Sequence, residues 1–378
     1  MKIGIVCYPT FGGSGVVATE LGKALAHKGH EVHFITYSRP VRLESFTENL
    51  FYHEVSVSDY PLFDYQPYEL VLSSRLVDVV KHNKLDLLHV HYAIPHASAA
   101  YMAQQILKSQ GIDIPYITTL HGTDITLVGR DASFEPVITF AINNSNAVTA
   151  VSESLKKDTY AHFNVSREIE VIPNFICLDD YGKSGADCQK KTFAPNGERI
   201  LVHVSNFRKV KRVEDVLRVF DRVRKKIPAK LILIGDGPER HNIEKLCREG
   251  NTSDDIRSLG KVVNPNEILS IADLFILPSE TESFGLAALE AMASKVPVIS
   301  TNTGGLPEVN VHGFSGFLSN VGDVDDMAEN ALRILSSDES LQTFRQNAYE
   351  QAKKFKLPKI LPMYERLYEK VTNRQLVS

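Results

Sequence analysis

Short runs of apolar residues alternate with segments of helical length along the whole chain. In the first half, the runs predict strands at residues 3–7, 32–36, 87–90, 116–120 and 147–151. In the second half, they predict strands at residues 200–205, 231–234, 274–277 and 298–300. Continuously apolar strands separated by helices are typical of a parallel sheet with helices on both faces. The two series therefore predict two doubly wound α/β domains.

The regular alternation is interrupted at residues 172–181, which lead into a polar stretch. We therefore place one domain at residues 1–172 and a second at 173–356. The amphipathic segment from about 357 to 378 is expected to be a helix that packs back on the first domain. Ligands of doubly wound sheets bind beyond the carboxyl ends of the strands. We expect the functional site in a cleft between the two domains.

Composition narrows the functional class. Of 378 residues, 43% are hydrophobic and 23% are charged, as in soluble globular proteins. The net charge of −4 gives no support for a nucleic acid or an anionic membrane as partner. The four cysteines lack CxxC spacing, which argues against a zinc site and a disulfide framework. The chain opens on a strand pattern rather than a signal peptide and has no run of 18 apolar residues, so a cytoplasmic protein is expected.

Two carboxylates in the second half, Glu282 and Glu290, are separated by seven residues. All residues of 286–293 except Glu290 are apolar, so this segment is expected to be a buried helix. A lone carboxylate in such a helix is costly unless it is hydrogen-bonded, and ribose hydroxyls are suitable partners. The helix start would offer an anion the backbone N–H groups of Ser283, Phe284 and Gly285. The alternative is a core helix whose one glutamate is salt-bridged to a neighbouring loop.

A glycine-rich loop, Gly13-Ser-Gly15-Val-Val-Ala18, follows the first strand and matches the pattern G-x-G-x-x-A. A dinucleotide site would also have a carboxylate at the end of the second strand. This chain has Arg39 there, which could suit the 2′-phosphate of NADP. The loop could also offer N–H groups to a different anion, or be no more than a tight turn.

Three histidines mark the ends of two strands: His89 and His91 end one, and His121 follows the next. These positions lie where a doubly wound sheet presents its ligand contacts. The histidines could bind hydroxyl groups, hold a metal with Asp124, or be ordinary strand-end residues. The motif G-x-S-x-G is absent, so a serine nucleophile elbow is not indicated.

A basic segment, residues 205–212, follows the first strand of the second domain, with four cations in its last five positions. This charge at a strand-to-helix junction suits a diphosphate, and the alternative is a solvated basic turn. Residues 303–308, which include Gly304 and Gly305, follow a later strand and could close over a ligand.

Taken together in chain order, these features resemble the retaining glycosyltransferases with the two-domain GT-B fold. The resemblance rests on the glycine loop, the basic segment, His121-Gly-Thr-Asp124, Ile172-Pro-Asn174, Gly235-Asp-Gly-Pro238, Glu282-x7-Glu290 and Gly304-Gly305-x-Pro-Glu308, and spans essentially the whole chain. Family members usually carry an arginine five residues before Lys211, where this chain has Asn206. Arg208 or Arg212 would take its place.

Residues 7–20, 89–96 and 205–208 are similar to those of one subgroup, the N-acetylglucosaminyl-malate synthases of bacillithiol biosynthesis. This resemblance implies transfer of GlcNAc from UDP-GlcNAc to the hydroxyl of L-malate with retention. It implies that neither a cofactor nor a metal is needed, because cationic side chains and a helix terminus take that role. Its implied partners are the two small substrates, without nucleic acid or membrane, and it leaves a homo-oligomer open.

The resemblance also implies roles for individual residues. The catalytic residues would be His121, Glu282 and Lys211. The donor would contact Gly13, Gly15, Asn206, Arg208, Lys211, Arg212, Val263, Glu282, Ser283, Phe284, Gly285 and Glu290. Malate is a dianion and needs local hydrogen-bond donors, for which the candidates are Ser14, Tyr92, Thr118, Thr119 and Arg130.

Other activities remain compatible with the sequence. A family member could use a lipid, an inositol or a sugar as acceptor. A sugar-nucleotide epimerase and a non-catalytic sugar-nucleotide-binding protein are further alternatives. An NADP-dependent oxidoreductase is a remoter one, because it rests on the glycine loop alone.

Overall fold

The computed structural model describes residues 1–10, 12–43, 48–57, 66–127, 129, 131–181, 186–249 and 254–373. The chain forms two compact units. Unit 1 comprises Met1–Asn174 and Pro358–Ser378, and unit 2 comprises Phe175–Leu357. The chain crosses between the units within two residues of the boundaries expected from the sequence. Its last helix belongs to unit 1.

Unit 1 is built on a seven-stranded parallel sheet with the order β3-β2-β1-β4-β5-β6-β7. Its strands are β1 (Lys2–Val6), β2 (Glu31–Thr36), β3 (Leu50–Glu54), β4 (Leu87–His91), β5 (Tyr116–Leu120), β6 (Ala147–Ala150) and β7 (Ile169–Val171). The five predicted strands of this half are confirmed within one residue at each end. Strands β3 and β7 were not predicted, because they lie at the two edges of the sheet and lack a continuous apolar run.

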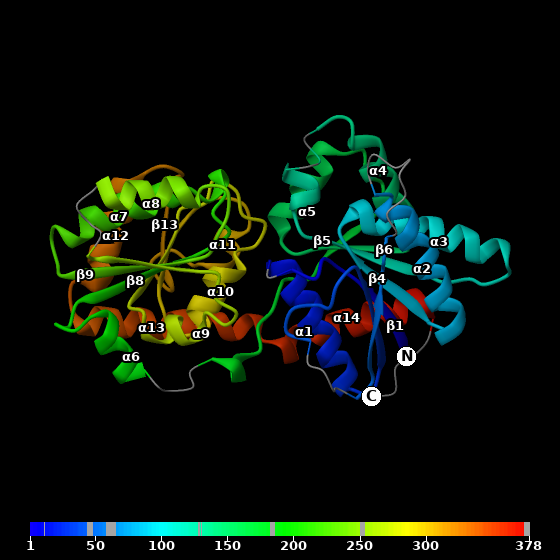
Figure 1. Cartoon of the computed structure of the whole chain (residues 1–378), viewed down its shortest axis with the longest axis horizontal. Helices are drawn as coiled ribbons and strands as arrows, with labels where there is room; N and C mark the ends of the chain where they lie inside the picture. Colours follow the sequence, from blue (N-terminus) through cyan, green and yellow to red (C-terminus); the bar gives the residue numbers. More distant parts are fainter. Residues whose placement is uncertain are drawn as a thin grey trace. The chain divides into compact units, whose positions relative to one another are not determined.

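Helices cover both faces of the unit 1 sheet (Figure 1). They are α1 (Gly13–His27), α2 (Tyr68–Asn83), α3 (Ser98–Ser109), α4 (Glu135–Asn144), α5 (Glu153–His162) and α14 (Leu357–Thr372). On one face, Leu88 and Val90 of β4 join the core that α2 and α3 form. On the other face, Tyr368 of α14 lies against His89, which also belongs to β4. Two short helical turns, η1 (Ala93–Ala97) and η2 (Thr123–Leu127), follow β4 and β5.

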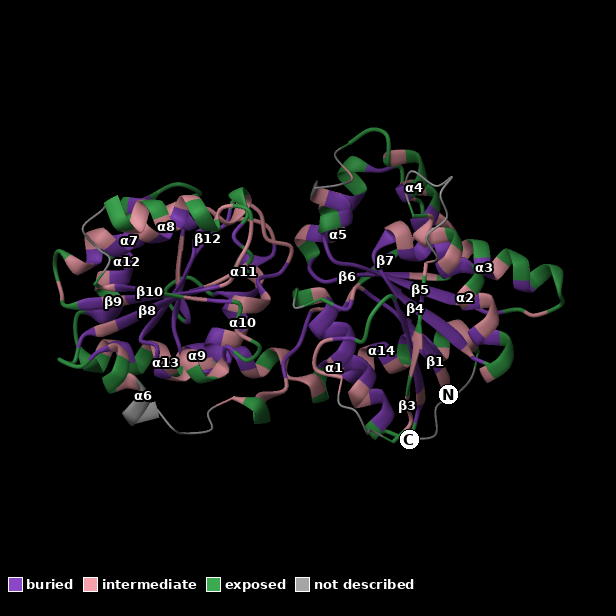
Figure 2. Ribbon diagram, viewed as in Figure 1, coloured by how far each residue is buried: buried purple, intermediate pink, exposed green. Residues whose placement is uncertain are grey.

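Unit 2 repeats this plan with a six-stranded parallel sheet in the order β10-β9-β8-β11-β12-β13. Its strands are β8 (Arg199–Val204), β9 (Ala229–Ile234), β10 (Ile256–Gly260), β11 (Leu274–Leu277), β12 (Val298–Thr301) and β13 (Gly316–Ser319). Here too, the two missed strands, β10 and β13, are the edges. The central strands are the most continuously buried elements of both units (Figure 2).

The helices of unit 2 are α6 (Ala186–Phe193), α7 (Val213–Arg224), α8 (Arg240–Glu249), α9 (Asn266–Ile271), α10 (Leu286–Ala293), α11 (Leu306–Val309), α12 (Val324–Leu335) and α13 (Asp338–Ala352). Short turns occur at η4 (Leu178–Asp180), η5 (Lys209–Lys211) and η6 (Lys353–Phe355). Within the described residues of both units, no helix combines the length and apolar character needed to cross a membrane.

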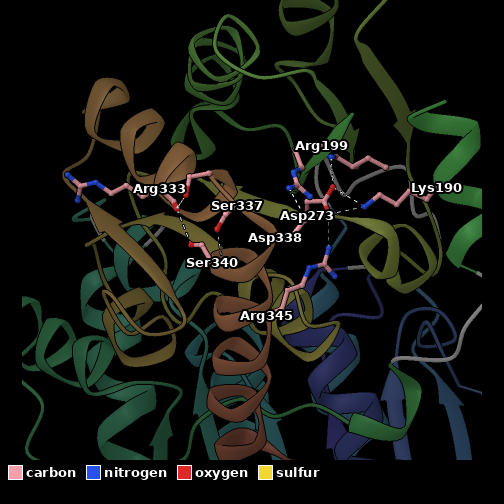
Figure 3. Close-up of polar contacts among 10 residues, drawn as sticks. Lys190, Arg199, Asp273, Arg333, Ser337, Asp338, Ser340 and Arg345 are labelled. Carbon is pink, nitrogen blue, oxygen red and sulfur yellow. Dashed lines mark hydrogen bonds and ion pairs between the residues drawn. The ribbon is translucent and has the colours of Figure 1, made fainter. Parts of the chain in front are cut away.

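A buried carboxylate ties the amino ends of two central strands of unit 2 together. Asp273, which is 1% exposed, directly precedes β11, and its carboxylate accepts a hydrogen bond from the backbone N–H of Ile200 in β8 at 2.9 Å. The same carboxylate forms ion pairs with Lys190 at 2.9 Å and Arg345 at 2.8 Å (Figure 3). The cluster fixes the strand edge opposite the one where ligands of such sheets bind.

Replacing Asp273 with alanine is expected to destabilise unit 2 by about 2–4 kcal/mol, because two cations and a buried N–H lose their shared acceptor. The measurement is urea unfolding followed by circular dichroism. The control is Asp338→Ala, which removes an ion pair to Arg199 from a side chain that is 86% exposed. We expect the control to leave the unfolding midpoint nearly unchanged. Equal midpoints for both variants would contradict the structural role of Asp273.

Candidate functional site

Four loops meet at the carboxyl edge of the unit 2 sheet. They follow β8, β9, β11 and β12, and backbone hydrogen bonds link them. The N–H of Phe207 donates to the carbonyl of Asp236 at 3.0 Å, and that of Glu280 donates to the carbonyl of Val210 at 2.8 Å. The N–H of Gly305 donates to the carbonyl of Glu282 at 2.9 Å. The basic segment, the glycine turn, the Glu282 motif and the Gly304-Gly305 motif therefore form one cluster.

The Gly304-Gly305 pair allows a close approach that other residues would block. A Cβ atom on Gly304 would lie 1.9 Å from the carbonyl oxygen of Glu282, and Gly304 has a φ of 56°. A Cβ on Gly305 would lie 2.4 Å from the carbonyl oxygen of Ser283. Only glycine can combine this backbone conformation with such contacts. The loop after β12 thus presses directly against the backbone that leads into α10.

Lys211 and Glu282 form the central charge pair of this cluster. The Nζ atom of Lys211 lies 2.5 Å from Oε1 of Glu282, which also accepts a hydrogen bond from the Ser279 hydroxyl at 3.1 Å. The two charged side chains are 19% and 14% exposed, so they are half-buried and still reach the surface. A cation and a carboxylate are therefore held at the edge where a ligand would bind.

The other residues of the basic segment have different surroundings. Arg212 adopts a left-handed conformation and its Nε donates to the buried Asp215 at 2.6 Å, which ties its guanidinium to the start of α7. Asn206 and Arg208 are exposed on the same loop. Lys211 is thus the predicted cation that the structure brings to Glu282, and Arg208 lies on the exposed side of its loop.

Glu290 lies on α10, one turn beyond the helix start. Gly285, with a φ of 95°, opens the helix, and the preceding Phe284 is buried. The sequence predicted a helix buried on all sides, which is wrong for one face: Glu290, Leu286 and Ala287 remain partly exposed. The Glu290 carboxylate accepts a hydrogen bond from Tyr181 at 3.4 Å. Partial exposure explains how an otherwise apolar helix accommodates a carboxylate.

The carboxyl edge of unit 1 carries the glycine loop and Tyr92. Gly15 lies in the first turn of α1, where a Cβ would approach the carbonyl oxygen of Tyr8 to 2.5 Å. Ser14, beside it, accepts a hydrogen bond from the Tyr92 hydroxyl at 2.7 Å. Gly13 is exposed at the same helix start. The structure thus brings together Ser14 and Tyr92, two of the predicted acceptor residues, although they are far apart in sequence.

His121 lies on the same edge, between β5 and η2. Its Nε2 atom lies 2.7 Å from Nδ1 of His91, and the residue is 9% exposed. The buried Asp124 accepts hydrogen bonds from the N–H groups of Ala93 at 2.8 Å and Gly122 at 3.1 Å, which joins the loops after β4 and β5. Burial lowers the pKa of His121 to about 3 and raises that of Asp124 to about 6. His121 is therefore neutral at physiological pH.

Some predicted residues are not brought to these positions. Thr118 and Thr119 are fully buried, and their hydroxyls are hydrogen-bonded to Ser145 and Thr149 at 2.8 and 2.7 Å, so the structure gives them core contacts in place of the expected acceptor contacts. The reason is that β5 lies in the middle of the sheet and is covered on both faces. Val263 is 67% exposed on the loop after β10. Arg130 lies outside the described residues.

Two partners of the site were missed by sequence reasoning. Ser279 binds Glu282, and its position three residues earlier is the only signal that could have revealed it. Tyr181 binds Glu290 across 109 positions of sequence, so no local pattern could have found it.

His89 bonds to the hydroxyls of Tyr368 and Thr119, both at 2.7 Å, and so acts as a core residue of unit 1.

Comparison with known proteins places the chain in a family. The profile of Glycosyltransferase Family 4 matches residues 11–180, and that of Glycosyl transferases group 1 matches residues 186–351. The chain is 46% identical to N-acetyl-alpha-D-glucosaminyl L-malate synthase of Bacillus anthracis, over 97% of this chain and 96% of that protein. Alpha-monoglucosyldiacylglycerol synthase of Acholeplasma laidlawii is 27% identical, with 92% of each chain covered.

Solved structures show the same fold. Sucrose-phosphate synthase from Thermosynechococcus elongatus superposes with a TM-score of 0.82 at 22% identity, covering 99% of both chains. Anabaena HepE in complex with UDP and glucose gives a TM-score of 0.81 at 18% identity, covering 98% of this chain and 99% of that one. The two parallel-sheet units are therefore those of a GT-B enzyme. Given both family profiles and the nearly full-length relative, the chain belongs to the group 1 glycosyltransferases, in the family of the N-acetyl-alpha-D-glucosaminyl L-malate synthases.

Proposed function

We propose that this glycosyltransferase transfers GlcNAc from UDP-GlcNAc to the hydroxyl of L-malate and forms the α-glycoside with retention, as the first step of bacillithiol biosynthesis. The nearly full-length identity of 46% to the Bacillus anthracis synthase supports the choice of substrates. The structural observation that carries the proposal is the Lys211–Glu282 pair beside the start of α10. We also propose that the enzyme acts in the cytoplasm and needs neither metal nor cofactor. A homo-oligomer is compatible with this function.

The proposed donor site uses the residues that the four loops bring together. Lys211 and the N–H groups at the start of α10, with Arg208 nearby, stabilise negative charge on the departing diphosphate. Glu290 accepts hydrogen bonds from the ribose hydroxyls. Glu282 positions the sugar, a role that we also propose for His121 of unit 1. These roles need a fixed cation and oriented dipoles, which the half-buried pair and the helix start provide.

The proposed transfer occurs on one face of the sugar. The bond from C1 to the diphosphate oxygen breaks while the malate hydroxyl oxygen bonds to C1 from the same side. The hydroxyl proton passes to the departing phosphate oxygen, so UDP and the α-glycoside are the two products. This route retains configuration without a nucleophile from the protein.

The proposed acceptor site lies on unit 1. Malate is a dianion, and the protein has a net charge of −4, so local donors must hold it. Ser14 and Tyr92 form one hydrogen-bonded pair, and the N–H groups at the start of α1 lie beside them. Arg130 remains a candidate for the carboxylates. Thr118 and Thr119 are not part of the proposed acceptor site, because both are buried in the sheet.

Nuclear magnetic resonance of the reaction product tests the proposal. UDP-GlcNAc and L-malate are incubated with the enzyme in EDTA, and the anomeric proton of the product is recorded. The proposal requires a GlcNAc-malate conjugate with α configuration. A β-linked product would overturn the retaining route, and UDP-GlcNAc converted equally well without malate would indicate an epimerase.

Glu290→Ala is expected to weaken UDP binding by about 10–100-fold, since hydrogen bonds to a charged acceptor contribute about 1.5–3 kcal/mol. Titration calorimetry with UDP measures the change. Glu267→Ala, an exposed substitution on α9 of the same unit, is the control and should bind UDP like the wild type. Unchanged UDP affinity in folded Glu290→Ala protein would contradict the ribose assignment.

A further inference from the structure

Three histidine rings are stacked in the core of unit 1 beneath the candidate acceptor site. His89 and His91 lie on the same face of β4, and their ring centroids are 4.6 Å apart. The ring of His91 in turn stacks on that of His121, at 5.0 Å. Nδ1 of His89 is hydrogen-bonded to the hydroxyl of Tyr368 on α14. His91 therefore lies between an anchored histidine and the histidine proposed to contact the sugar.

The contact between His91 and His121 contains one proton. Burial holds the pKa of His91 well below its usual value and lowers that of His121 to about 3, so both rings are neutral at pH 7. A neutral imidazole carries its proton on one nitrogen only. Nδ1 of His91 faces Nε2 of His121 at 2.7 Å, so one of these nitrogens donates and the other accepts. The geometry allows two arrangements.

The far nitrogen of His91 distinguishes between them. Nε2 of His91 is buried, and within the described part of the chain it has no hydrogen-bond partner. A proton there would be a buried N–H without an acceptor, which is rare in proteins. His96 shows that this site tolerates a bare Nε2: its Nδ1 must donate to the His91 carbonyl, and its own Nε2 is buried without a partner. His91 therefore carries its proton on Nδ1 and donates it to His121.

We propose that His91 is a positioning residue that fixes His121 in the Nδ1–H tautomer. Because Nε2 of His121 accepts from His91, the proton of His121 must reside on the ring nitrogen that does not face His91. His121 is then a hydrogen-bond donor, suited to an oxygen of the transferred sugar, and its ring cannot turn without breaking the bond. The role towards the sugar rests on the proposed function, whereas the tautomer does not.

The tautomer is tested first, without any substrate. Protein labelled with ¹⁵N-histidine is examined by long-range ¹H–¹⁵N correlation, and signals are assigned from their loss in His91→Asn and His121→Gln proteins. The proposal requires protonated Nδ1 and bare Nε2 on both His91 and His121. A protonated Nε2 on His121 in the wild type would overturn it, whatever the enzyme's substrates prove to be.

The kinetic test uses a graded pair of variants. His91→Phe keeps the ring but removes the donor, and should lower kcat by about 10–100-fold with little change in KM for UDP-GlcNAc. His91→Asn places an amide near the position of Nδ1 and should recover much of that loss. Wild-type kcat in folded His91→Phe protein, or equal losses in both variants, would overturn the positioning role.

The matched control is His33→Phe. His33 is also fully buried in unit 1 and also bonds to a second histidine, since its Nδ1 lies 2.8 Å from Nε2 of His53. It lies on β2 and has no part in the candidate site. We expect wild-type kcat and an unchanged His121 tautomer in this variant. If the wild type releases no UDP with malate while the tautomer is as predicted, the proposed function fails and the assignment of the proton stands.

Discussion

Lys211→Ala is expected to lower kcat by about 10²–10³-fold, the largest effect of any single substitution considered for the donor site. The Nζ atom of Lys211 is fixed 2.5 Å from Glu282 and beside the start of α10, where the diphosphate would depart. Removing this cation leaves the developing charge with the helix terminus and Arg208 alone. The measurement is the rate of UDP release at saturating UDP-GlcNAc and malate.

Two further variants separate this effect from a structural one. Lys209→Ala removes an exposed cation from the same turn, and should keep most of the wild-type rate. Lys211→Ala also leaves the Glu282 carboxylate without its ion pair, so the double variant Lys211→Ala/Glu282→Ala shows whether that carboxylate is the cause of the loss. Wild-type kcat in folded Lys211→Ala protein would remove Lys211 from the proposed mechanism.

Unit 1 is expected to lose stability steeply on acidification below pH 6. Burial lowers the pKa of His89 and His121 to about 3, that of His96 to about 4, and that of His91 well below its usual value. These groups are neutral when folded and take up protons near pH 6.5 when unfolded. Their contribution to stability is therefore complete above pH 6.5 and falls as the pH drops towards the folded-state values.

One carboxyl group acts in the opposite direction. Burial raises the pKa of Asp124 to about 6, so the folded protein binds a proton there that the unfolded chain binds only near pH 4. Counted over these four histidines and Asp124, the unfolded state binds about three more protons than the folded state near pH 5. This difference corresponds to a loss of about 4 kcal/mol for each pH unit.

Urea unfolding between pH 7.5 and 4.5, followed segment by segment with hydrogen-exchange mass spectrometry, measures this dependence. His96→Gln removes one of the titrating groups and should reduce the slope for unit 1 by about 1.4 kcal/mol per pH unit. In unit 2, burial lowers the pKa of His203 to about 4, so that unit should show a shallower slope. A pH-independent unit 1 between pH 6.5 and 4.5 would contradict the neutral histidine core.

The fold could be predicted from sequence only where strands are buried along most of their length. Central strands such as β5 and β11 are buried throughout and appear as continuous apolar runs, and their bounds were predicted at both ends. The edge strands β3 and β10 contain polar residues and are partly exposed, so a search for continuous apolar runs does not find them. Apolar periodicity reports burial, and edge strands are stabilised mainly by backbone pairing to one neighbour.

The candidate site was predictable only where its residues lie close together in sequence. Glu282, the start of α10 and Glu290 lie within nine positions, so spacing alone placed them along one strand-to-helix connection. The glycine loop of unit 1 matched a dinucleotide pattern, yet the chain is a glycosyltransferase. The pattern is not specific for dinucleotides, because a glycine turn before a helix suits many anions.

Contacts between distant segments were beyond the reach of sequence reasoning. The link from Tyr181 to Glu290 and the pairing of Ser14 with Tyr92 depend on the topology of each unit. The contact of His91 with His121 depends on the register of β4 against β5. Thr118 and Thr119 were expected to contact the acceptor, because they lie near the end of a strand. Both are buried, because β5 lies in the middle of the sheet.

The most direct test of the central claim is the release of UDP from UDP-GlcNAc with and without L-malate, with EDTA in both reactions. The account predicts fast release that depends on malate and is unaffected by EDTA. UDP binding by calorimetry without release in the presence of malate would contradict the acceptor and direct the search to other hydroxy acids, inositols and lipids. Release abolished by EDTA would contradict a mechanism based on Lys211 and the start of α10.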